Sequence, residues 1–309
     1  MFQRACDWWR VASRGTGEIL PLRPGLFIPV FLMSLGLSTI APALRAQFAS
    51  GVSLVEVYAT VVDQRGEAVA GLRADDFEVE EDGQPQTISV FTAGDIPLSL
   101  AIAIDRSFSL PRAKLTEAVT ATQRLLGELR PEDRVLLLAV GSQVETLSPL
   151  SIDHRAAYDA LLGLDSWGTT PLFDATVSAL DAIQTASGRR ALILISDGSD
   201  RYSQATAADA LNAARHRDVI AYPIALQRPT PPFFVELATA TGGRSLSAPD
   251  GRALSAGLSS VATELRRQYL IGYAPNSASE KRPGWRSISV RVKRTGLQVR
   301  ARDGYYAVR

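Results

Sequence analysis

The chain has 309 residues, of which 46% are hydrophobic and 21% are charged, and this composition gives no reason to expect disorder. The formal net charge is +1. Because residues 1–46 carry five basic and two acidic side chains, the rest of the chain is slightly acidic. That balance gives no support to a nucleic-acid partner.

The first segment has the pattern of an export signal. Arginines precede an uncharged run over residues 26–44, which ends in small residues. We therefore predict that residues 1–46 are a signal peptide, removed before a mature chain that begins near Gln47. The alternative is an uncleaved anchor, because the run is about long enough to cross a bilayer, but Pro29 and Pro42 favour cleavage. In either case we expect a secreted, periplasmic or cell-envelope protein, in contact with a membrane only through an uncleaved anchor.

Residues 47–94 are predicted to supply the first strands of a small antiparallel β domain. Residues 52–62 alternate apolar with polar or small side chains, as a strand exposed on one side does. Residues 75–91 are predicted to form two short strands joined by a turn at Asp82 and Gly83.

From residue 95 to residue 267 the pattern changes to short, continuously apolar runs separated by amphipathic segments. The predicted strands are 98–104, 134–140, 190–195 and 219–226, with an antiparallel edge strand at 143–149. The predicted helices are 111–129, 154–163, 171–186, 206–216, 231–240 and 251–267. Apolar strands of this kind require a sheet covered on both faces, so we predict an α/β domain with a doubly wound, mostly parallel sheet.

Residues 268–309 return to the alternation of strands. We predict strands at 268–275, 285–294 and 297–308, the last two forming a hairpin around Thr295 and Gly296. An isolated hairpin is marginally stable, so we expect these strands to complete the sheet that residues 52–91 begin. The α/β domain would then be an insertion in the β domain.

Oxygen-bearing side chains follow several of the predicted strands. They stand in three loops: Asp105, Ser107 and Ser109; Thr169 and Thr170; and Asp197. Because open α/β sheets bind ligands at the carboxyl ends of strands near a switch point, we expect these loops to converge. Taken alone, the first triplet is explained as well by a turn in which Ser109 caps a helix that starts at Pro111.

The three loops resemble the metal-ion-dependent adhesion site of the von Willebrand factor type A domain, with its D-x-S-x-S motif, distant Thr and distant Asp. The chain is further similar to a secreted bacterial family, the VWFA-related acidobacterial domain, through its opening at 55–86 and its ending at 268–307. This resemblance implies a Rossmann-like α/β domain. It also implies that Mg²⁺, or in its place Mn²⁺ or Ca²⁺, is held by Asp105, Ser107, Ser109, Thr170 and Asp197.

In the family's scheme the hydroxyls hold the ion directly, while the acids act mostly through water, and a Glu or Asp carboxylate of a partner protein completes the coordination. Thr170 is preferred to Thr169 because it directly precedes the "PLFDA" segment. One departure is that Phe108 and Leu110 stand where the family commonly has Gly and Met. Phe108 restricts the loop backbone and puts metal affinity or partner access in question.

The resemblance favours a non-enzymatic adhesion or scaffolding module. One alternative is a metal-dependent hydrolase, which needs a general base and has only Asp174 and Asp200 left at this edge. Another is a structural envelope protein whose site has decayed. The motifs HExxH, CxxC and GxSxG are absent from the sequence, and His154 and His216 are expected to be solvated.

Two further features have open interpretations. Trp167 either touches a ligand beside the site or packs under its loop. The basic residues of the last predicted hairpin share one face and form either a solvated edge or a stripe for an acidic polymer: Arg291, Lys293, Arg300 and Arg302.

Overall fold

The structure is a computed structural model, and it describes residues 54–94, 96–275 and 283–307. The predicted signal segment, residues 1–46, lies outside these ranges. None of the helices within them combines the length and the apolar character that crossing a membrane requires.

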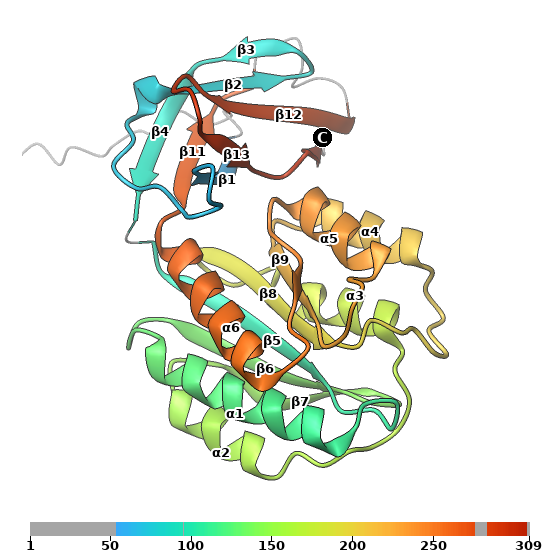
Figure 1. The fold of residues 1–309 in the computed structure, drawn as a ribbon. Helices are drawn as coiled ribbons and strands as arrows, with labels where there is room; N and C mark the ends of the chain where they lie inside the picture. Colours follow the sequence, from blue (N-terminus) through green and yellow to red (C-terminus); the bar gives the residue numbers. More distant parts are fainter. Residues whose placement is uncertain (1–53, 95, 276–282, 308–309) are drawn as a thin grey trace, which may run out of the picture. The chain divides into compact units, whose positions relative to one another are not determined.

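A six-stranded sheet forms the centre of the α/β part (Figure 1). In spatial order its strands are β10 (Leu246–Ser247), β9 (Ile220–Ala225), β8 (Arg189–Ser196), β5 (Leu98–Asp105), β6 (Arg134–Val140) and β7 (Val144–Ser151). Neighbouring strands are parallel except β6 and β7, whose antiparallel pairing confirms the predicted edge strand. The two-residue strand β10 was not predicted.

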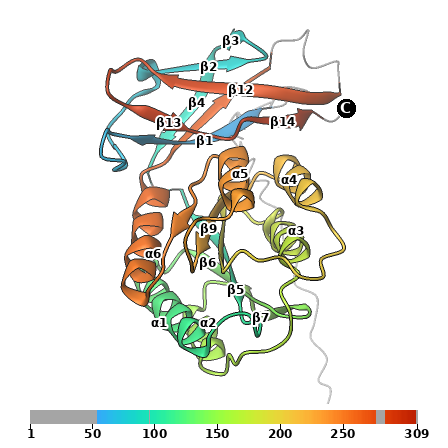
Figure 2. The same ribbon diagram turned by 45° about the vertical axis from the view of Figure 1, so that its right-hand side comes forward.

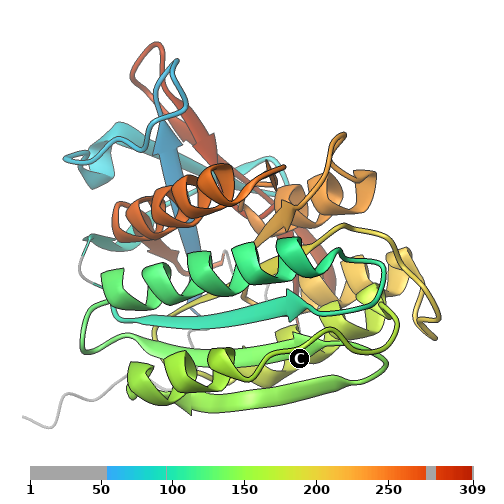
Figure 3. The same ribbon diagram turned by 60° about the horizontal axis from the view of Figure 1, so that its bottom comes forward.

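Helices cover both faces of this sheet. On one face lie α1 (Arg112–Glu128), α2 (His154–Leu162) and α6 (Gly251–Arg266), and on the other lie α3 (Leu172–Ile183), α4 (Ala207–His216) and α5 (Pro232–Thr241). Figure 3 shows α1 and α6 side by side. In β5, Ile102 and Ile104 pack toward the first face and Ala101 and Ala103 toward the second, because successive side chains of a strand alternate. The predicted doubly wound α/β fold is confirmed.

A β sandwich is built from the two ends of the chain (Figure 2). One antiparallel sheet contains, in order, β13 (Gln298–Arg300), β1 (Val55–Val62), β11 (Tyr269–Tyr273) and β4 (Ile88–Ala93). The other contains β14 (Gly304–Ala307), β12 (Gly284–Val292), β2 (Phe77–Glu81), which follows the 3-10 helix η1 (Ala74–Asp76), and β3 (Gln84–Gln86). Both sheets combine early and late strands, so the α/β part is inserted in the sandwich as predicted.

The predicted pairing of the β strands was only partly correct. Residues 284–287 of β12 pair antiparallel with residues 304–307 of β14, as the predicted hairpin requires, but residues 288–292 of β12 pair with β2, and β13 pairs with β1 in the other sheet. The strands therefore complete two sheets rather than one. Residues 75–91 enter three strands: β2 and β3 flank the predicted turn, and β4 lies in the other sheet. Alternation marks a strand with one buried face, but it does not identify the neighbouring strand.

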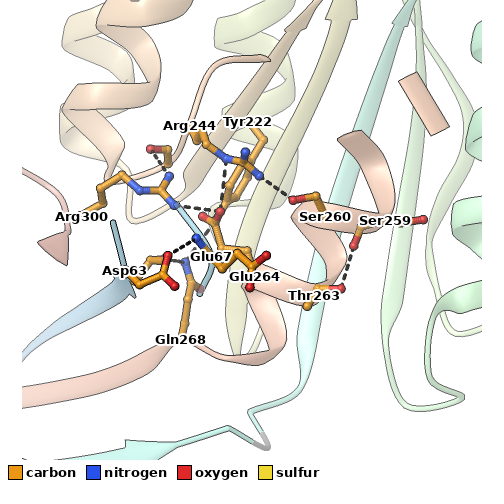
Figure 4. Close-up of polar contacts among 12 residues, drawn as sticks. Asp63, Glu67, Tyr222, Arg244, Ser259, Ser260, Thr263, Glu264, Gln268 and Arg300 are labelled. Atoms are coloured by element: carbon orange, nitrogen blue, oxygen red, sulfur yellow. Dashed lines mark hydrogen bonds and ion pairs between the residues drawn. The ribbon is translucent and has the colours of Figure 1, made fainter. Parts of the chain in front are cut away.

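A buried polar network joins α6, β9 and β13 (Figure 4). The Glu264 carboxylate accepts a hydrogen bond from the Tyr222 hydroxyl at 2.9 Å and is ion-paired with Arg300 at 2.8 Å and with Arg244 at 3.3 Å. The Gln268 amide donates to the Tyr222 hydroxyl at 3.2 Å. Buried charges of this kind are stable only when they are paired.

The four basic residues of the last predicted hairpin, interpreted as either a solvated edge or a stripe, do not lie on one face. Arg291 lies in β12 and is ion-paired with Glu80. Arg300 is the last residue of β13, and Arg302 follows that strand. Both side chains are mostly buried in ion pairs, Arg300 with Glu264 at 2.8 Å and Arg302 with Asp218 at 3.3 Å. Because β12 and β13 belong to different sheets, their basic residues do not line up.

Candidate metal centre

The candidate site lies at the carboxyl end of β5, where the order of the sheet changes direction. The chain passes from β5 through α1 to β6 on one side, and β8 occupies the other side. Open α/β sheets form a crevice at such a switch point. Because Ile104 of β5 pairs with Ile195 of the parallel β8, the loops after these two strands leave the same edge.

The structure brings together the side chains of all five predicted site residues, which we call the oxygen cluster: Asp105, Ser107, Ser109, Thr170 and Asp197. The hydroxyls of Ser107 and Ser109 are 2.9 Å apart, and that of Thr170 donates to Ser107 at 2.6 Å. Ser109 donates to the Asp197 carboxylate at 3.1 Å. Three separate segments therefore converge as expected, while metal binding by these oxygens stays a prediction.

The oxygen cluster has a buried floor and an accessible side. Asp105, Ser107 and Thr170 are fully buried, whereas Ser109 is exposed and Asp197 is half-buried. It is the hydroxyl of Thr170, rather than that of Thr169, that contacts the serines, while the Thr169 backbone N–H donates to the Ser142 hydroxyl at 3.2 Å.

Asp105 anchors the floor of the oxygen cluster. Its carboxylate accepts hydrogen bonds from the Ser107 backbone N–H at 2.9 Å and from the Ser196 hydroxyl at 2.7 Å. Burial raises the pKa of Asp105 above its usual value, the bonds from Ser196 and Ser107 oppose that rise, and the charge of Asp197 adds to it. These hydrogen-bond donors are neutral, so a nearby cation would stabilise the buried carboxylate.

Two glycines allow the loops to approach the oxygen cluster. Gly168 has φ +80, and a Cβ on it would lie 2.4 Å from the backbone nitrogen of Ser142. Gly198 has φ +81, and a Cβ there would lie 2.2 Å from Cγ of Pro231. Both positions need a left-handed backbone and close contact, which only glycine combines without strain.

The other two acids at this edge hold the loop after β8 against the start of α3. The Asp174 carboxylate accepts from the backbone N–H groups of Gln204 and Ala205, each at 2.9 Å. Asp200 accepts from the Phe173 backbone N–H at 3.2 Å and from the Ser203 hydroxyl at 2.5 Å. The sequence showed Asp174 as a helix-start acid and Asp200 as a turn acid, but their common role depends on tertiary contacts.

Two aromatic side chains lie beside the oxygen cluster. Phe108 is 72% exposed, so its ring is largely accessible to solvent. Trp167 is 44% exposed, its ring lies 5.2 Å from the Arg106 guanidinium, and a Cβ on Gly141 would come within 2.8 Å of the ring edge. Trp167 therefore packs against its own loops and also presents a surface to solvent, while contact with a ligand stays a prediction.

The two histidines lie away from this site. His154 Nε2 is hydrogen-bonded to the Asp133 carbonyl at 2.8 Å. His216 is exposed, as predicted, and stacks on the Tyr306 ring with centroids 3.8 Å apart.

The oxygen cluster fits a hard divalent cation. Mg²⁺ takes six oxygen ligands at about 2.0–2.1 Å, so adjacent ligands of an octahedron lie about 3 Å apart. The separation of 2.9 Å between the Ser107 and Ser109 hydroxyls and that of 3.1 Å between Ser109 and Asp197 are close to this spacing. Within the described ranges no three His, Cys, Asp or Glu side chains cluster as metal ligands.

Residues 100–199 match the family model of the von Willebrand factor type A domain. No curated protein matches the chain. Among solved structures, a von Willebrand factor type A protein from Catenulispora acidiphila is 16% identical with a TM-score of 0.50, and the match covers 84% of this chain and 75% of that one. The manganese-loaded TRAP protein of Plasmodium vivax is 19% identical with a TM-score of 0.44, over 74% of this chain and 98% of that one.

An aerotolerance-related membrane protein from Bacteroides fragilis is 17% identical with a TM-score of 0.45, over 54% of this chain and 98% of that one.

The family match begins in β5 and spans the loops that carry the oxygen cluster. The Catenulispora structure shows the same fold at low identity. Residues 100–199 therefore match the von Willebrand factor type A domain, and the α/β part of this chain has the fold of that domain.

Proposed function

We propose that this chain is an exported, non-enzymatic protein-binding module that holds Mg²⁺ in the oxygen cluster and engages a Glu or Asp carboxylate of a protein partner. The observation that carries this proposal is the convergence of three loops. It connects three hydroxyl residues and two carboxylates through a series of hydrogen bonds at one edge of the sheet. Export rests on the sequence pattern of residues 1–46 alone.

Each residue has a distinct role in this proposal. Ser107, Ser109 and Thr170 offer neutral oxygens as direct ligands, while Asp105 and Asp197 provide negative charge, mostly through bound water. Because few anions touch it, a divalent cation held there stays electrophilic and offers an open coordination position to a carboxylate. Mn²⁺ or Ca²⁺ would serve as substitutes.

The surroundings of the oxygen cluster support binding over hydrolysis. A hydrolase needs a general base within reach of the attacking water. Asp174 and Asp200, the remaining acids at this edge, accept hydrogen bonds from backbone N–H groups and from Ser203. Both carboxylate oxygens of Asp174 and Oδ1 of Asp200 are engaged in holding the loop.

A metal titration tests the site directly. We expect the protein to bind Mg²⁺ and Mn²⁺ with one site, and Ser109→Ala and Asp105→Ala to weaken that binding at least tenfold. Thr116→Ala is the matched control, because Thr116 is an exposed hydroxyl residue on α1 whose side chain bonds only within its helix. Absent binding, or equal binding by Ser109→Ala and the parent, would contradict the proposal.

A second experiment tests the partner. Envelope and culture fractions are passed over the immobilised protein with Mg²⁺ and again with EDTA, for the parent, Ser109→Ala and Thr116→Ala. We expect a protein retained by the parent and by Thr116→Ala in Mg²⁺ only. Partners retained equally in EDTA would show that recognition does not use the metal.

A further inference from the structure

Two large aromatic side chains remain accessible beside the oxygen cluster, and we call them the aromatic rim: Phe108 and Trp167. Phe108 is 72% exposed and Trp167 is 44% exposed. Exposed apolar groups rimmed by polar residues mark interaction sites, and aromatic residues are enriched in the energetically dominant parts of interfaces.

The chain places the aromatic rim next to the candidate ligands. Phe108 stands between Ser107 and Ser109, and Trp167 precedes Thr170 by three residues. The Phe108 backbone N–H donates to the Gly168 carbonyl at 3.0 Å, and the Trp167 backbone N–H donates to the Arg106 carbonyl at 2.7 Å. These two bonds hold the aromatic-bearing loops side by side.

Trp167 is held in place before any partner arrives. One edge of its ring packs over Gly141, where a Cβ would lie only 2.8 Å from the ring, and the Arg106 guanidinium lies 5.2 Å from the ring centroid. Arg106 is itself fixed by an ion pair with Glu145 at 2.5 Å. A rigid aromatic surface loses little conformational entropy when it is covered, which favours binding.

The charges nearby suit an acidic segment. Arg201 is exposed in the loop after β8, and its backbone N–H donates to the Thr170 carbonyl at 2.7 Å. A divalent cation in the oxygen cluster would balance Asp105 and Asp197, so Arg201 would remain as an exposed cation next to the site. Positive charge beside an apolar surface complements a carboxylate with an apolar neighbour.

Resting on the function proposed above, we propose that the aromatic rim determines partner choice: it binds an apolar or aromatic side chain next to the acidic residue that completes the metal coordination. The partner is then a protein segment in which Asp or Glu has an apolar neighbour.

A displayed library of random peptides tests this inference with Mg²⁺ and again with EDTA. We expect the parent to enrich peptides with Asp or Glu beside Phe, Trp, Leu or Ile, in Mg²⁺ only. For a synthetic copy of an enriched peptide, Phe108→Ala and Trp167→Ala should each weaken binding at least tenfold, the cost of a hot-spot side chain. Phe108→Leu, which keeps an apolar side chain, should retain most of the affinity.

Ile152→Ala is the control, because Ile152 is 62% exposed and lies far from the oxygen cluster. It follows Ser151 of β7, which pairs with Val135 at the start of β6, whereas the oxygen cluster lies at the carboxyl ends of the parallel strands. It should leave peptide affinity unchanged, and all four variants should bind Mn²⁺ as the parent does. The proposed role of the aromatic rim would be overturned if the metal-dependent peptides shared an acid but no apolar neighbour, or if no peptide bound in a metal-dependent way. In either case the result of the metal titration would still stand. Absent Mn²⁺ binding would overturn both proposals.

Discussion

Gly198 directly follows Asp197, and its missing side chain lets the loop after β8 pass Pro231. A methyl group there would meet Cγ of Pro231 at 2.2 Å in a backbone conformation that L-residues rarely adopt. We predict that Gly198→Ala lowers the free energy of unfolding by about 2–3 kcal/mol and weakens Mn²⁺ binding, because Asp197 moves away from Ser109. Urea denaturation and a metal titration measure the two effects.

Gly66→Ala separates the backbone strain from the collision. Gly66 has φ +78, nearly that of Gly198, but a Cβ there has no atom within 4 Å. This variant should cost only about 1 kcal/mol and leave metal binding intact. Equal effects of the two substitutions would show that contact with Pro231 does not position Asp197.

The residue pattern was sufficient to predict which side chains converge at the sheet edge but not which residues support them. Asp105, Ser107 and Ser109 follow a buried strand at a recognisable spacing, so their position at the sheet edge could be inferred. Ser196 and Gly141 gave no such signal, since one residue packs under Asp105 and the other under Trp167 only after distant loops meet. Contacts between residues far apart in sequence have no local pattern.

At the scale of elements, α3 and the loop after β8 hold each other through Asp174. Its carboxylate accepts two backbone N–H groups, as a capping residue does, but across 30 or more positions of the chain. We predict that Asp174→Ala lowers the free energy of unfolding by about 1–2 kcal/mol. Asp165→Ala should cost less than about 0.5 kcal/mol, because the ion pair of Asp165 with Arg112 is exposed on both sides. Chemical denaturation measures the free energy of unfolding of both variants. Equal losses for Asp174→Ala and Asp165→Ala would contradict the role assigned to Asp174.

Asp133 ties the end of α6 to the start of the central sheet. Its buried carboxylate is ion-paired with Arg266 and accepts from the backbone N–H groups of Arg130 at 2.8 Å and Leu98 at 3.4 Å. Burial alone would raise the pKa of Asp133, but the hydrogen bonds from Arg266 and the backbone outweigh it and lower that pKa.

A carboxyl whose pKa is lowered by folding stabilises the protein above its ordinary pKa of about 4, and that stabilisation is lost as the pH falls through the folded-state value. We therefore predict that the parent exceeds Asp133→Asn in unfolding free energy at pH 7 and that the difference shrinks below about pH 4. Urea titrations at several pH values measure it. A difference that stays constant down to pH 2.5 would contradict the prediction.

The elements themselves followed from periodicity wherever a strand is buried on both faces. The apolar runs of β5, β6, β8 and β9 could be placed within one or two residues because helices cover the whole sheet. The sandwich strands could be recognised, but their pairing could be predicted only in part. β12 and β13 are adjacent in sequence and both alternate, yet their hydrogen bonds lie in different sheets.

At the scale of the whole described chain, the insertion makes the sandwich depend on residues from both ends. β1 pairs with β11 and β13, so its hydrogen bonds span more than 200 positions of sequence. Such long-range pairing is slow to form and gives no local signature. The insertion was predicted instead from the marginal stability of an isolated hairpin, which implied that the late strands pair with the early ones.

Glu264 is where the inserted part and the sandwich share a buried charge. Its side chain is 5% exposed and is paired with Arg300, the last residue of β13. Removing one member of a buried ion pair leaves an uncompensated charge, although Arg244 and Tyr222 still contact Glu264. We predict that Arg300→Met lowers the free energy of unfolding by about 2 kcal/mol, while Arg291→Ala, which breaks a half-exposed pair, changes it by less than about 0.5 kcal/mol.

Adding Glu264→Gln to Arg300→Met should cost less than the sum of the single substitutions, because the neutral amide no longer requires the guanidinium. Denaturation of the three variants and the double variant completes the cycle. Additive costs would mean that the two side chains act independently.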